Sequence, residues 1–246
     1  MGLALAATTV VAWFYLMRAA AGMNAVAGDA QMHAAMGMAD LRGWGLADWV
    51  GLFAMWAVMM VAMMLPSAAP VILLVLGVYR RRDDPQARIA SVAFLGGYLF
   101  AWTAFSVGAS GAQLALHRAA LLQPDMRIGS TVLAGVMLIV AGLYQWLPMK
   151  SACLTHCRSP LAFLSQYWRE GPAGGFGLGV RHGMFCVGCC WLLMTLLFVL
   201  GVMNLLWVAG LTAFVLIEKL ARGGAVVGRI AGAAVAGWGA YLLVTL

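Results

Sequence analysis

The sequence predicts an all-α protein: a polytopic bundle of about seven transmembrane helices, with a cytoplasmic N-terminus, forming one integral membrane domain over residues 1–246. Hydrophobic residues make up 64% of the chain and charged residues only 9%, whereas soluble domains carry roughly 25% charged residues. The mean hydropathy is +0.94. Several apolar runs reach about 20 residues, the length that crosses a hydrocarbon core of about 30 Å. These observations exclude a water-soluble globular domain.

Seven apolar segments are predicted to span the bilayer: 3–23, 47–78, 89–115, 128–147, 176–200, 203–217 and 226–245. The first segment has no basic residues at its start, which predicts a retained helix and not a cleaved signal peptide. The second is too long for one straight crossing, and its Pro66 and Pro70 predict a kink or a tilt. The sixth is short, so a six-span bundle remains an alternative.

The basic residues predict the orientation, because cytoplasmic loops of membrane proteins are enriched in Lys and Arg. Eleven of the 15 Lys and Arg residues fall in the segments 80–88, 148–181 and 218–229. This distribution predicts a multi-pass protein of the bacterial cytoplasmic (inner) membrane, with these segments inside. It also explains the formal net charge of +7. The bilayer is therefore the expected partner, and no nucleic-acid partner is predicted.

All five cysteines fall on or near the predicted cytoplasmic side. Two lie in the loop 148–175 and three in the first half of the fifth span. The cytosol is reducing, which disfavours a disulfide framework and favours metal ligands or a redox pair.

The spacing of the histidines and cysteines along the sequence predicts two His/Cys clusters. In the fifth span a histidine and three cysteines recur at i, i+4, i+7 and i+8, which places them on one helix face. In the loop, one turn of helix would present two cysteines and a histidine together. Thiolate and imidazole ligands suit Cu(I), Zn(II) or an iron–sulfur centre, and Cu(I) is favoured here. Packing cysteines and an interfacial or helix-initiating histidine are the alternatives. The candidate ligands are Cys153, His156, Cys157, His182, Cys186, Cys189 and Cys190.

Methionines supply a second group of soft ligands. Met55, Met59 and Met63 stand at i+4 spacing through the second span, and thioethers bind Cu(I) without losing a proton. Met59 and Met63 are candidate ligands, with ordinary packing as the alternative.

The predicted outer loop, residues 24–46, contains Met32, His33 and Met36 as further candidates. A short amphipathic interfacial segment is the alternative. Soft ligands would thus stand outside, in the core and on the cytoplasmic side, an order that suits the transfer of Cu(I).

Four stretches resemble a bacterial family of integral membrane proteins that are predicted to bind metal and have no assigned function. A Lys-x2-Cys-x3-Cys loop followed by a Cys-x2-Cys-Cys helix is the most specific part. The stretches are "MWAVMMVAMMLPSAAP" (55–70), "YQWLPMKSACLTHCRSPLAF" (144–163), "GGFGLGVRHGMFCVGCCWLLM" (174–194) and "GVMNLLWVAGLTAFVLIEK" (201–219).

The resemblance implies a multi-helix membrane fold and a metal site built from the five cysteines. Met203, Asn204, Glu218 and Lys219 also fall within its motifs. Asn204 is predicted to cap the helix that follows it. Glu218 is a candidate for proton coupling or metal release, with an interfacial ion pair as the alternative.

Three functions fit these residues. The first is binding, transfer or delivery of a soft metal, with a metal-delivering protein as a partner. The second is a membrane thiol-disulfide oxidoreductase, and the third is a non-catalytic, metal-holding subunit of a larger membrane complex. Walker, His-Glu-x-x-His and Gly-x-Ser-x-Gly motifs are absent from the sequence. A non-enzymatic role is therefore favoured.

Overall fold

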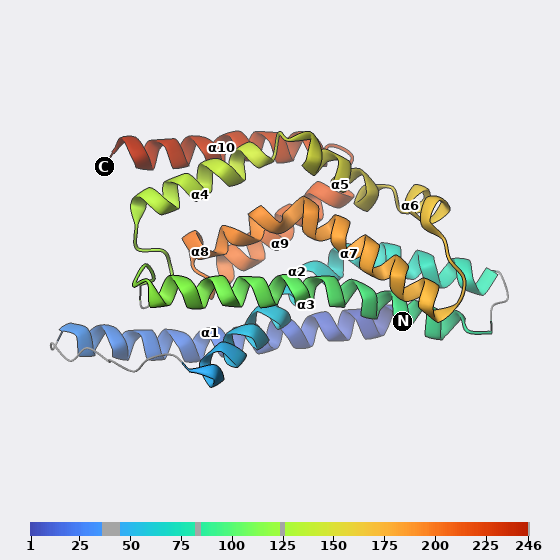
Figure 1. Ribbon diagram of the computed structural model, residues 1–246, viewed down its shortest axis with the longest axis horizontal. Helices are drawn as coiled ribbons and strands as arrows, with labels where there is room; N and C mark the ends of the chain where they lie inside the picture. The colour runs from blue at the N-terminus through green and yellow to red at the C-terminus, as the bar shows by residue number, and fades with distance from the viewer. Residues whose placement is uncertain (36–44, 82–84, 124–125, 246) are drawn as a thin grey trace.

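A computed structural model describes the chain except for residues 36–44, 82–84, 124–125 and 246, and it leaves the side chains of 23–35 undescribed (Figure 1). The described residues form α-helices, joined by turns that include one isolated bridge between Leu122 and Ile128. The all-α prediction is therefore confirmed. The helices are α1 (Gly2–Ala35), α2 (Leu46–Arg81), α3 (Ala87–Arg118), α4 (Thr131–Tyr144), α5 (Pro148–Arg158), α6 (Pro160–Tyr167), α7 (Gly171–Thr195), α8 (Leu197–Leu200), α9 (Leu205–Leu220) and α10 (Gly224–Val244).

Five stretches of described helix are long and apolar enough to cross a membrane, namely Gly2–Gly22, Leu46–Arg81, Ala87–Arg118, Gly171–Leu200 and Gly224–Val244. A sixth arises if α4 and α5, which are bent by 61° relative to each other, are one broken span. Each of the seven predicted segments coincides with a helix, but the sixth, α9, has only 16 residues. The count of seven spans is therefore not confirmed.

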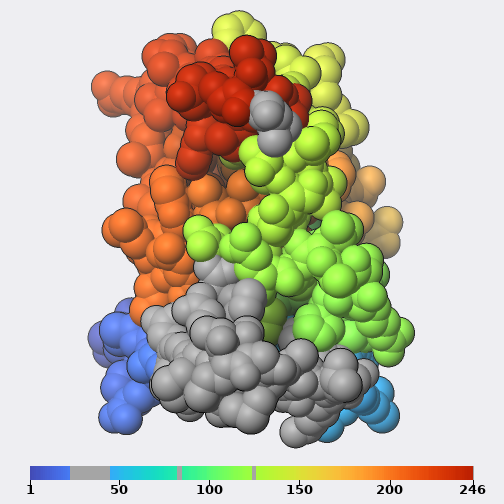
Figure 2. All heavy atoms as spheres, turned by 90° about the vertical axis from the view of Figure 1, so that its left-hand side faces the viewer, coloured from blue at the N-terminus to red at the C-terminus, as the bar shows by residue number. Residues whose placement is uncertain are grey.

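The helices run roughly side by side along the long axis of the molecule (Figure 1). α2 packs against α1 and α3, α3 against α7, and α4 against α10. The end-on view in Figure 2 places α10 and α1 on opposite sides of the bundle. α7 contacts α3, α5 and α9, so its cysteine-bearing face lies in the interior.

Small residues let α3 and α7 approach closely. A Cβ at Gly179 of α7 would collide with the backbone of Phe94, and one at Gly97 of α3 with the backbone of Phe176. Glycines on both sides of a contact allow two helices to pack backbone against backbone. This contact fixes the depth of α7 against α3 and with it the level of the cysteines.

Two segments predicted as loops contain helix. α1 continues to Ala35, into the segment predicted as a loop, and α5 and α6 occupy much of the predicted cytoplasmic loop. α2 runs as one helix through Pro66 and Pro70. Asn204 is the N-cap of α9, where its side chain accepts a hydrogen bond from the Leu206 amide at 3.2 Å. The capping prediction is confirmed.

Candidate metal centre

Three cysteines of α7 point into the interior of the bundle. Cys186, Cys189 and Cys190 are each exposed by 1% or less. Their spacing of three and four residues places them on one helix face, as the sequence predicts. All five cysteines are free thiols, so no disulfide joins them.

A fourth thiol, that of Cys157, belongs to α5. The Cys157 thiol interacts with the thiols of Cys186 and Cys189, and the Sγ atoms of Cys189 and Cys190 lie 3.2 Å apart. Cys190 also interacts with Cys186. Four thiols from two helices thus meet in one place, and we call Cys157, Cys186, Cys189 and Cys190 the thiol cluster.

Polar contacts with α9 hold α5 in position. At the start of α5, the Lys150 ammonium, 1% exposed, lies 2.5 Å from a carboxylate oxygen of Glu218 and also donates to Gln145. At its end, Arg158 donates to backbone carbonyls of Glu218, Ala221 and Arg222. These carbonyls lie in the last turn of α9 and in the two residues that follow it, where helix-end carbonyl groups need such donors. The Glu218 ion pair is thus formed with Lys150.

Two further side chains contact Cys186. The Lys219 Nζ lies 2.9 Å from the Cys186 Sγ and 3.2 Å from the Ser67 Oγ. The Tyr98 Oη lies 3.2 Å from the same sulfur and 3.1 Å from the Met64 carbonyl oxygen. Sequence reasoning missed Tyr98 and Ser67, because they are 88 and 119 residues from Cys186 and belong to no spacing pattern.

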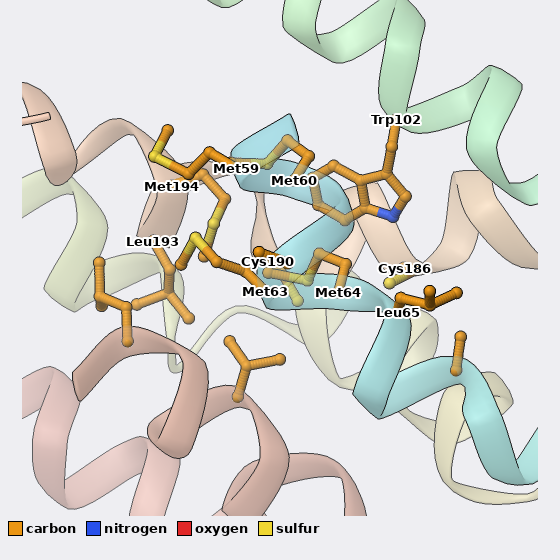
Figure 3. Packing of buried hydrophobic residues seen from close by; sticks show 14 of the residues in the cluster. Met59, Met60, Met63, Met64, Leu65, Trp102, Cys186, Cys190, Leu193 and Met194 are labelled. Carbon is orange, nitrogen blue, oxygen red and sulfur yellow. The ribbon is translucent and has the colours of Figure 1, made fainter. Parts of the chain in front are cut away.

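Thioethers line the side of the thiol cluster that faces α2. Figure 3 shows Met59, Met60, Met63 and Met64 of α2 gathered with Met194 of α7 beside Cys190. All five methionines are exposed by 1% or less. Met59 and Met63 were predicted. Met194 was not, although it stands at i+4 from Cys190, on the same face of α7. We call these five residues the thioether wall.

The remaining candidates take different positions. His182 is 2% exposed, its ring lies among Phe94, Tyr98 and Phe163, and its Nδ1 has no partner among the described residues. The half-buried His156 stacks on Phe185 at 4.1 Å between ring centroids, and its Nδ1 lies 2.9 Å from the Ala152 carbonyl oxygen.

Cys153 is also half-buried and lies against α7, where a Cβ on Gly188 would come within 2.9 Å of its sulfur. The predicted ligands Met32, His33 and Met36 lie outside the residues whose side chains are described.

The thiol cluster fits a soft metal by its donor atoms, although two of its sulfurs, those of Cys189 and Cys190, stand too close together for a loaded site. Among the described residues, no group of three or more His, Cys, Asp and Glu side chains is arranged so that it could hold a metal ion without moving. Zn–S bonds of about 2.3 Å in a tetrahedron would separate the sulfurs by about 3.8 Å, against 3.2 Å for Cys189 and Cys190. Loading therefore requires the thiols to spread by a few tenths of an ångström. Thiolate and thioether sulfurs are the donors that select Cu(I).

Comparison with known protein families supplies an independent observation. Residues 53–242 match the family described as "PpoB2: Copper chaperone". The chain belongs to this family. The matched region contains all five cysteines and the thioether wall, and it excludes Met32, His33 and Met36. No curated protein and no solved structure matches the chain. The family supports the prediction of a metal-related protein and the preference for copper.

Proposed function

We propose that this protein is an integral membrane copper chaperone that binds Cu(I) at the thiol cluster and passes it to a metal-receiving protein. One observation carries this proposal: three buried thiols of α7 and the half-buried Cys157 thiol of α5 meet beside a wall of five methionines. Membership of a family described as copper chaperones supports the same choice of metal.

The donor set favours Cu(I) over the other soft metals. Cu(I) is bound by thiolates and thioethers, whereas structural Zn(II) is usually held by four Cys or His ligands and makes little use of thioethers. His182 and His156, the two histidines on the helices that carry the cysteines, are packed among aromatic rings. Sulfur is therefore the predominant donor in this part of the molecule, beside the buried Nδ1 of His182, which has no partner among the described residues.

The arrangement of the elements supports a transfer role. Four methionines of the thioether wall lie in the middle of α2, and Met194 lies on α7 beside Cys190 of the thiol cluster. If the basic segments are cytoplasmic, copper moves between thioethers within the bilayer and thiols close to its inner face. Thioethers bind weakly and without proton loss, which suits transit, while thiolates bind more firmly and suit holding before delivery.

A seven-helix topology with the N-terminus inside belongs to the same proposal. α9, although only 16 residues long, would cross most of the hydrocarbon core at a rise of about 1.5 Å per residue. α4 and α5 then act as one crossing followed by a bent inner segment. The bacterial inner membrane is the proposed location.

The test is the metal content of protein purified anaerobically in detergent and supplied with Cu(I) and Zn(II) together. We expect about one copper per chain in the parent, little zinc, and loss of copper from the Cys186→Ser/Cys189→Ser/Cys190→Ser variant. The matched control is Cys153→Ser, which removes a thiol outside the thiol cluster and should retain copper. Absence of metal in the parent, together with a reducible disulfide, would contradict the proposal and favour a thiol oxidoreductase.

A further inference from the structure

Lys219 is a charged residue in the interior of the bundle. It is 6% exposed, and its Nζ is hydrogen-bonded to a serine hydroxyl and a cysteine sulfur. The adjacent carboxylate does not serve as its partner, because Glu218 is paired with Lys150 at 2.5 Å. The two neighbouring residues at the end of α9 thus have different roles. Glu218 holds α5 in position, and Lys219 contacts the thiol cluster.

A buried ammonium is costly unless a negative charge lies beside it. Ser67 is neutral and supplies only a hydrogen bond. The Tyr98 hydroxyl faces Cys186 from the other side and also donates to a backbone carbonyl. Sulfur is therefore the group around Lys219 that can carry the compensating negative charge.

We propose that Lys219 is the built-in counter-charge of the copper–thiolate complex and a determinant of metal choice. This inference rests on the proposed function, since it assigns a role at the same site. Lys219 has no lone pair to offer in its charged form, so it is a positioning residue and not a ligand. It acts through the sulfur of Cys186.

The charge balance of the site explains why Lys219 favours Cu(I) over Zn(II). Cu(I) held by two thiolates forms a complex of charge −1, and the Lys219 ammonium brings the buried site to zero. The two S–Cu bonds replace two S–H bonds, the protons leave to solvent, and the copper stays in the +1 state. Zn(II) held by the same two thiolates leaves the site at +1, and Zn(II) held by all four leaves it at −1. Zn(II) reaches zero only with three thiolates, so a neutral site with two thiolates is specific to Cu(I). A neutral site is favoured in a low-dielectric interior.

The experiment compares the parent with Lys219→Gln, which removes the charge, can still form a hydrogen bond with the Ser67 hydroxyl, and adds no sulfur donor beside Cys186. Affinities are measured anaerobically in detergent, for Cu(I) against a colorimetric Cu(I) chelator and for Zn(II) against a zinc-binding dye. We expect the Cu(I) affinity of Lys219→Gln to fall by about 10- to 100-fold, the usual effect of losing a group that supports a metal ligand. The Zn(II) affinity should fall by less, so that the ratio of the two affinities drops at least several-fold.

Lys219→Arg is the charge-retaining control, and it should keep a Cu(I) to Zn(II) ratio close to that of the parent. An unchanged ratio in Lys219→Gln would overturn the role of Lys219 while leaving copper binding by the parent intact. A parent that binds no Cu(I) would instead overturn the proposed function itself. The two failures are therefore distinguishable.

A second variant covers the case in which Lys219→Gln folds poorly. Lys219→Leu also removes the charge and adds no metal donor, and it should lower the ratio of Cu(I) to Zn(II) affinity in the same way. A ratio equal to that of the parent, in protein that keeps the helical circular dichroism of the parent, would contradict the counter-charge.

Discussion

At the scale of single residues, the candidate site consists of soft sulfur donors held by polar neighbours. Cys186 is the centre of this arrangement, because it contacts thiols, the Lys219 ammonium and the Tyr98 hydroxyl. Groups that hydrogen-bond to a ligand fix its orientation and tune its affinity. The chemistry of the site therefore depends on residues of α2, α3 and α9 as well as on the cysteines of α7.

Substitution of Met194 distinguishes a role in copper transfer from a role in packing alone. Met194→Leu conserves shape and hydrophobicity, so the free energy of unfolding should change by less than about 1.5 kcal/mol. Because the thioether is lost from the thioether wall, we expect slower loading of the thiol cluster by Cu(I) at unchanged final occupancy. Stopped-flow loading of protein in detergent, with Cu(I) supplied from a chelate, measures the rate.

The control for this prediction is Met184→Leu. Met184 is on the same helix but is 59% exposed on the outer surface, and its substitution should leave the loading rate unchanged. Equal rates for the parent and Met194→Leu would show that this methionine only packs.

At the scale of helices, the spacing of residues predicts what lies on one face but not which faces meet. The placement of Cys186, Cys189 and Cys190 on a common face follows from helical periodicity, and the structure agrees. The approach of Cys157 depends on the docking of α5 onto α9 through the buried Lys150–Glu218 pair. Those residues are 68 positions apart, and no local pattern relates them.

Glycine substitutions test the helix contact that sets the depth of α7. Gly179→Ala places a methyl group against the backbone of Phe94 and should force α3 and α7 apart, at a cost of about 1–3 kcal/mol or more, as in other overpacked interiors. Gly177→Ala is the matched control, since nothing lies within 4 Å of the Cβ it would add. It should be neutral or stabilise by up to about 1 kcal/mol, because alanine favours helix more than glycine does.

The measurement for both variants is the unfolding free energy in detergent from denaturant titration, together with Cu(I) occupancy. Gly179→Ala should lose stability and copper together, because separating the helices also moves the thiol cluster. Equal stability of the two variants would mean that α3 and α7 are not packed backbone against backbone.

At the scale of the whole molecule, composition alone predicts an all-α apolar bundle, and the helices agree with the seven predicted segments in place and order. The number of crossings is harder to predict, because α9 is short and α4 bends into α5. The distribution of basic residues gives the orientation only as a proposal. A sequence pattern also cannot reveal that Lys219, at the end of an apolar helix, reaches a sulfur on a different helix.

The proposed topology can be tested with single cysteines introduced into a variant in which the five native cysteines are serine. Ser165→Cys, on the exposed surface of α6, should resist a membrane-impermeant maleimide in intact cells and react after lysis. Thr245→Cys, directly after α10, should react once the outer membrane is made permeable, with the inner membrane intact. The reverse pattern would invert the orientation and place the thiol cluster near an oxidising compartment.

The central claim, that the thiol cluster holds Cu(I) through sulfur, is tested most directly by X-ray absorption at the copper edge of anaerobically loaded protein. We predict a Cu(I) edge and a first shell of two or three sulfur atoms, with about one copper per chain. The same shell should persist in Cys153→Ser and disappear in Cys186→Ser/Cys189→Ser. A first shell of nitrogen or oxygen atoms in the parent, or an unaltered spectrum in the double variant, would contradict the account.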